Sequence, residues 1–127
     1  MWRDRALKIL LVLFGLVFLA FIYPLALSVL HPDKASEGDA MMISIYVALG
    51  AFLLLAARNP SRHRSLIAFA GWANITHAVV MAVMAIRLAS DRSGLLVAAA
   101  ISGPIGFSLL ALRPPKEFVG QANAAGA

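Results

Sequence analysis

The chain contains no cysteine, and charged residues make up only 13% of its 127 positions. Without cysteine it can form no disulfide, no thiolate metal site and no cysteine nucleophile. The hydrophobic fraction is 61% and the mean hydropathy is +0.86. Because a soluble domain of this size could not bury so much apolar surface, the composition predicts that lipid is the main solvent around the chain.

Four apolar runs make up most of the sequence, and each is long enough for a transmembrane helix. A helix needs about 20 residues to cross the hydrocarbon core of a bilayer, and within lipid its backbone must bond to itself. We therefore predict an all-α protein, a four-helix transmembrane bundle that forms a single domain over residues 1–119. The expected spans are residues 6–30, 41–57, 65–89 and 94–112, followed by a flexible tail over 120–127.

Lysine and arginine are distributed unevenly between the two sides of these spans. Eight lie on the side that carries both termini and the 58–64 connection, and three lie on the other side. Cytoplasmic loops carry an excess of these residues, so we expect both termini in the cytoplasm. This topology also explains the net charge of +5, so the expected partner is the lipid bilayer, with a homo-oligomer or a larger membrane complex possible, and no nucleic acid.

The third run contains a group of polar residues near its middle, around Asn74 and His77. These two residues are three positions apart and share one helix face, and polar groups at this depth usually face the interior of a bundle. Ser102 lies near the middle of the fourth run and is the first choice as a hydrogen-bond partner for His77. With Trp72 beside them, these residues form the predicted polar site, which is either interhelical or ligand-binding.

Three interpretations of Asn74 and His77 remain open: hydrogen bonding between helices, which we favour, a pocket for a ligand or substrate, and ligation of a metal, haem or chlorophyll by His77. Haem held between two histidines would need a second one at matching depth, whereas His31 and His63 lie in connections on opposite sides. The sequence predicts no catalytic residue, no metal site and no cofactor. No Asp or Glu lies inside any span, which argues against a proton-coupled exporter.

Two local patterns concern the second and fourth runs. Their ends are similar, Leu54-Leu55-Ala56-Ala57-Arg58-Asn59-Pro60 and Leu109-Leu110-Ala111-Leu112-Arg113-Pro114-Pro115. The similarity indicates either two duplicated hairpins, as in some transporters, or two ordinary cytoplasmic stop signals, which we favour. Gly103 and Pro104 are expected to kink or loosen the fourth helix.

The segments Met42–Gly50, Leu54–Pro60, His63–Phe69 and His77–Ala82, with Trp72, resemble a family of small bacterial membrane proteins that is catalogued only as a domain of unknown function. The resemblance implies a four-span protein of the bacterial inner membrane and supplies no activity, cofactor or catalytic residue. We predict a non-enzymatic binding, scaffolding or accessory protein. The alternatives are a transporter or small-molecule-binding protein with a pocket around Asn74 and His77, or a cofactor-binding subunit that ligates through His77.

Overall fold

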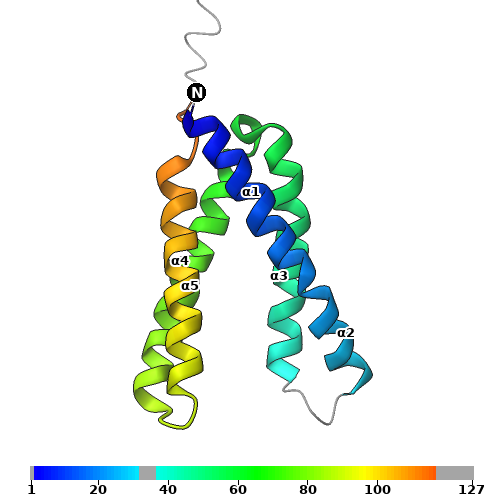
Figure 1. Ribbon diagram of the computed structural model, residues 1–127, viewed down its shortest axis with the longest axis vertical. Coiled ribbons are helices and arrows are strands. Elements are labelled where there is room, and N and C mark those ends of the chain that lie inside the picture. The colour runs from blue at the N-terminus through cyan, green and yellow to red at the C-terminus, as the bar shows by residue number, and fades with distance from the viewer. Residues whose placement is uncertain (1, 32–36, 117–127) are drawn as a thin grey trace, which may run out of the picture.

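The computed structural model describes residues 2–31 and 37–116, and within these ranges every regular element is helical (Figure 1). The elements are α1 (Trp2–Ala20), α2 (Ile22–Leu30), α3 (Glu37–Arg58), the short 3₁₀ helix η2 (Pro60–His63), α4 (Arg64–Arg87) and α5 (Arg92–Leu112). Four helical stretches are long and apolar enough to cross a membrane: Trp2–Leu30, Gly38–Arg58, Pro60–Arg87 and Arg92–Leu112. The prediction of an all-helical chain with four such stretches is confirmed. The predicted tail over 120–127 lies outside the described residues.

The first stretch is not one helix, because α1 ends at Ala20 and α2 begins at Ile22. Pro24 lacks an N–H group and its ring clashes with the carbonyl four residues earlier, which is that of Ala20. The backbone tightens at this point, where the N–H of Phe21 donates to the carbonyl of Phe18 at 3.1 Å. By contrast α5 continues through Pro104. The first stretch is therefore interrupted at Phe21, three residues before Pro24, a break that the sequence analysis does not predict.

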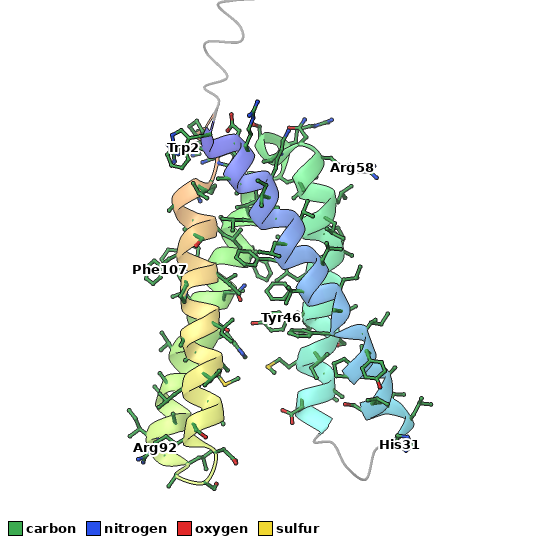
Figure 2. All side chains as sticks on the ribbon, viewed as in Figure 1. Trp2, His31, Tyr46, Arg58, Arg92 and Phe107 are labelled. Carbon is green, nitrogen blue, oxygen red and sulfur yellow. The ribbon has the colours of Figure 1, made fainter. Side chains whose placement is uncertain are left out.

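The helices form two hairpins that meet at one end and diverge toward the other (Figure 1). The first hairpin consists of α1, α2 and α3, and the second of α4 and α5; the most extensive contacts are those of α1 with α3 and of α4 with α5. The hairpins meet at the end that carries Trp2 and Arg58, and they are farthest apart at the ends that carry His31 and Arg92 (Figure 2).

A pair of glycines brings the two long helices of each hairpin into close contact. In the first hairpin, a Cβ atom on Gly50 would lie 2.7 Å from the backbone nitrogen of Leu19 and 2.8 Å from the carbonyl oxygen of Gly15. In the second, a Cβ atom on Gly106 would lie 2.6 Å from the carbonyl oxygen of Gly71 and 3.0 Å from the backbone nitrogen of Ile75. No larger residue fits at such distances, so glycine sets the helix spacing in both hairpins.

The two glycine pairs are equivalent by residue number, since Gly71 and Gly106 each follow Gly15 and Gly50 by 56 positions. The same shift relates Leu19 to Ile75, and it relates buried core positions of one hairpin to buried core positions of the other. These buried pairs are Leu11 and Ile67, Leu49 and Ile105, and Leu53 and Leu109. The two hairpins therefore have equivalent helix contacts at positions 56 residues apart, a shift one residue longer than the similar helix ends indicate.

Arginine side chains form hydrogen bonds to backbone carbonyls at the end where the hairpins meet. Arg3 of α1 donates to the carbonyl oxygen of Ala111 in the last turn of α5 at 2.9 Å. Arg64, the first residue of α4, donates through Nε to the carbonyl oxygen of Pro114. The last carbonyls of a helix have no partner within it, and basic groups stabilise that end. The bond from Arg3 also links the first hairpin to the second.

Candidate functional site

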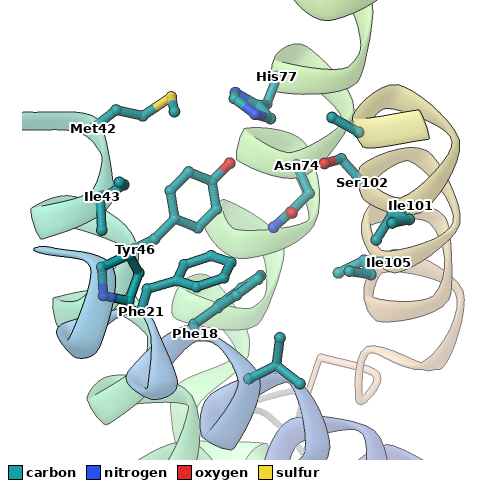
Figure 3. Close-up of a pocket in the computed structure, with 13 residues that line it drawn as sticks. Phe18, Phe21, Met42, Ile43, Tyr46, Asn74, His77, Ile101, Ser102 and Ile105 are labelled. Carbon is teal, nitrogen blue, oxygen red and sulfur yellow. The ribbon is translucent and has the colours of Figure 1, made fainter. Parts of the chain in front are cut away.

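A pocket of about 340 Å³ lies between the two hairpins, away from the end at which they meet (Figure 3). Its walls come from all four long helical stretches, and none of the described residues that line it is charged. The lining residues are Val17, Phe18, Phe21, Pro24, Met42, Ile43, Tyr46, Asn74, His77, Ala98, Ile101, Ser102 and Ile105.

The second hairpin supplies the polar wall of this pocket. Asn74 is 1% exposed, and its Nδ2 donates to the carbonyl of Ala70 at 2.8 Å, within its own helix. A carboxamide has a second N–H and an oxygen as well, so one bond leaves most of its hydrogen-bonding capacity for the pocket. His77 lies one turn further along α4, and the Ser102 hydroxyl points into the same space from α5 (Figure 3).

The first hairpin supplies an aromatic wall opposite these groups. The ring of Tyr46 lies edge-on to that of Phe18, with centroids 5.1 Å apart, and its centroid is 6.4 Å from that of Phe21. Tyr46 extends from α3 across the space between the hairpins, and its hydroxyl points toward α4 (Figures 2 and 3). With the tilted contact between Phe18 and Phe21, whose centroids are 6.0 Å apart, the three rings form one aromatic cluster.

His77 makes an aromatic contact across the pocket where the sequence predicts a hydrogen bond. Its ring is edge-on to Tyr46, with centroids 5.5 Å apart and an interplanar angle of 64°. Among the described residues, no hydrogen bond joins His77 to Ser102 or to any other residue. Asn74 is bonded only within α4. The interhelical hydrogen bonds that we favoured are thus not formed, and the polar groups face the pocket instead.

The structure brings together three of the four predicted site residues and separates the fourth. Asn74, His77 and Ser102 line the pocket, whereas Trp72 does not and is 60% exposed. Residues two apart on a helix do not face the same way, so Trp72 lies on the outer side of α4 while Asn74 faces inward.

Sequence reasoning missed the aromatic wall, because a phenylalanine within an apolar run carries no signal of its own. The shift of 56 residues would have found it. It relates Phe18 to Asn74, Phe21 to His77 and Tyr46 to Ser102, and all six of these residues line the pocket. The pocket therefore lies where equivalent faces of the two hairpins meet.

The described residues offer little else for chemistry. They contain no group of three or more His, Asp or Glu side chains that could hold a metal ion. A second hollow, of about 350 Å³, lies at the end where the hairpins meet, and residues of the chain ends and of the connection before η2 line it. These residues are Asp4, Lys8, Arg58, Asn59, Pro60, Ser61 and Pro114.

Comparison with known families agrees with the resemblance seen in the sequence. The model of a family of unknown function, DUF6632, matches residues 3–103. The chain belongs to this family. The DUF6632 match covers the first hairpin, α4 and the first half of α5, and so includes every residue that lines the pocket except Ile105. No curated protein and no solved structure matches the chain.

Proposed function

We propose that this protein spans the bacterial inner membrane four times, with both termini in the cytoplasm, and binds a small uncharged molecule in the pocket between its hairpins. It acts as a non-enzymatic binding protein or accessory subunit. A binding function explains why polar side chains face the pocket, whereas a purely structural role does not.

The outer surface of the helices supports the location in a membrane. Large apolar side chains are exposed along every long helix, including Ile9 at 66%, Ile45 at 64% and Ile86 at 78%. Exposed apolar surface on this scale is unfavourable in water and suits contact with lipid. The arginines of the end at which the hairpins meet, among them Arg3 and Arg64, support a cytoplasmic location of that end.

The observation that carries the proposed binding function is the set of polar groups left without partners across the pocket. Polar side chains inside a membrane are costly and usually mark a functional site or bond to one another. Here His77 has no hydrogen bond within the described chain, and Asn74 bonds only within its own helix. An apolar pocket with a few convergent polar groups is the usual form of a small-molecule site.

Photo-cross-linking at two positions of α5 tests this proposal. A diazirine amino acid replaces Ile101, which lines the pocket, or Phe107, which points outward from the same helix (Figure 2). The two residues are 58% and 66% exposed, so they form a matched pair. After irradiation of native membranes, mass spectrometry should find a small-molecule adduct at position 101 and none of that mass at position 107. Only phospholipid or protein adducts at position 101 would refute the proposal.

A second candidate function is transport of the bound molecule. The observation that favours it is the place of the pocket between two equivalent hairpins, since many transporters bind substrate where two repeats meet. The bond from Arg3 to Ala111 would then hold one of two arrangements of the hairpins. Uptake of the cross-linked molecule by vesicles that contain the purified protein would distinguish transport from binding alone.

A further inference from the structure

The two walls of the pocket come from equivalent faces of the two hairpins but differ in chemistry. At the three equivalent pairs, the first hairpin carries Phe18, Phe21 and Tyr46, and the second carries Asn74, His77 and Ser102. The backbone contacts that place these faces are the same in both hairpins, down to the close approach at the glycine pairs. A molecule in the pocket therefore meets rings on one side and hydrogen-bonding groups on the other.

The aromatic wall fits a flat ring better than a flexible chain. The ring of Tyr46 contacts Phe18 and Phe21 edge to face, and the rings of Phe18 and Phe21 lie tilted by 34° with centroids 6.0 Å apart. The ring of His77 adds a further edge-on contact across the pocket, 5.5 Å from Tyr46. Aromatic rings prefer offset or edge-on neighbours at centroid distances of about 4.5–7 Å. A planar ring between Tyr46 and α5 would complete a cluster of this kind.

The polar wall excludes two other occupants of a membrane pocket. A phospholipid headgroup carries a charged phosphate, and none of the described residues that line the pocket is a cation. An acyl chain carries no hydrogen-bonding group, so it would leave Asn74, His77 and Ser102 facing hydrocarbon, which costs free energy. A neutral oxygen substituent satisfies these groups without a counter-charge.

Building on the proposed function, we infer that the ligand is a neutral, lipid-soluble molecule with an aromatic or quinonoid ring, an oxygen substituent on that ring and an apolar tail. The ring lies against the aromatic wall of the first hairpin, and the oxygen lies toward Asn74, His77 and Ser102. The tail extends past Ile101 toward the diverging ends of the hairpins.

Three probes of similar size test the two parts of this assignment. Para-octylphenol has both the ring and the oxygen, octylbenzene lacks the oxygen, and para-octylcyclohexanol lacks the flat ring. Binding to the full chain in lipid nanodiscs is measured calorimetrically against empty nanodiscs. The phenol should bind at least about fivefold more tightly than either analogue, because a net hydrogen bond or an aromatic contact contributes about that much.

Substitutions on the polar wall should weaken the preference for oxygen. His77→Phe introduces the residue found at the equivalent position of the first hairpin, and Ser102→Ala removes only a hydroxyl. The combined variant should lose most of the preference for the phenol over octylbenzene, because only Asn74 is left to bond the oxygen. Ser108→Ala is the matched control, because Ser108 lies on the same helix, bonds to the carbonyl of Pro104 and does not line the pocket. Thermal unfolding of each variant checks that it is folded.

The outcomes separate this inference from the proposed function. Equal binding of the three probes, an unchanged preference in the combined variant, or no saturable binding of any probe would overturn the assigned ligand class. Each of these results leaves the proposed function standing as long as position 101 acquires a small-molecule adduct. A phospholipid, or a second copy of the chain, cross-linked at position 101 would overturn both.

Discussion

The first and second hairpins have the same contacts between their helices and different side chains facing the pocket. Gly15 and Gly50 allow the close approach of the two long helices of the first hairpin. Gly71 and Gly106 do the same in the second hairpin. The equivalent pocket positions are aromatic in the first hairpin and polar in the second. The comparison shows that a few backbone contacts fix the frame, whereas the side chains that face inward are free to differ. Any account of function therefore depends on that difference.

The largest expected effect concerns the direction of the two hairpins in the membrane. Each hairpin crosses the membrane twice and returns the chain to the side on which it started, the cytoplasm in our proposal. Ser61, between the two hairpins, should therefore lie in the cytoplasm, and Ser90, in the turn between α4 and α5, should lie outside. Because the chain has no cysteine, Ser61→Cys and Ser90→Cys each create a single thiol. In intact cells an impermeant maleimide should label the second variant and leave the first unlabelled until the cells are lysed. The opposite pattern would show that the topology is reversed.

The next effect concerns the glycine contacts of the frame. Gly50→Ala and Gly106→Ala would each place a Cβ atom within 2.8 Å of at least one backbone atom of the neighbouring helix. We expect similar losses of about 1–3 kcal/mol in the free energy of unfolding, the usual range for overpacking. Reversible unfolding in mixed detergent micelles measures this loss.

Gly38→Ala and Gly103→Ala are the controls for these two variants. A Cβ atom on Gly38 meets nothing within 4 Å, and one on Gly103 comes no closer than 3.9 Å to its nearest neighbour. Both controls should leave stability unchanged or raise it slightly, since alanine favours helix. A loss confined to one hairpin would show that the two frames are not equivalent.

Some features of the fold can be predicted from the sequence and others cannot, for physical reasons. The four apolar stretches were found because hydropathy alone identifies them. The interruption at Pro24 was not found, since Pro24 and Pro104 look alike by local rules and only Pro24 interrupts its helix in the structure.

The sequence predicts the polar wall of the pocket and does not predict its aromatic wall. Asn74, His77 and Ser102 were identified because polar residues are rare inside apolar runs. The predicted hydrogen bond between His77 and Ser102 is not seen in the structure, where the His77 ring instead contacts Tyr46 of the first hairpin. Trp72 was included as a neighbour in sequence, although its spacing from Asn74 places it on the other side of the helix.

A smaller effect is expected at the equivalent positions 21 and 77. His77 forms no hydrogen bond with another described residue, so His77→Gln and His77→Leu should both cost no more than about 1 kcal/mol of stability. Phe21→Leu should cost about as much, through loss of its ring contacts. Unfolding in the same micelles compares the three variants. If the glutamine variant were much more stable than the leucine variant, His77 would have to be bonded to another helix.

The smallest effect expected is in the visible spectrum. Haem held by two histidines across the pocket would require a second histidine in its lining, and His77 is the one histidine among the described residues that line it. Protein purified in mild detergent from its own membranes should therefore be colourless. A Soret or chlorophyll band that disappears in His77→Leu would instead support ligation of a cofactor through this residue.

Native mass spectrometry tests the central claim, that the pocket between the hairpins holds a small neutral molecule, most directly. Ala98 lines the pocket, and Ala100 is exposed on the same helix, so Ala98→Trp fills the pocket and Ala100→Trp adds the same bulk outside it. The account predicts that the wild-type protein and Ala100→Trp carry the same small additional mass and that Ala98→Trp lacks it. The same mass on all three proteins, or none on the wild type, would contradict the account.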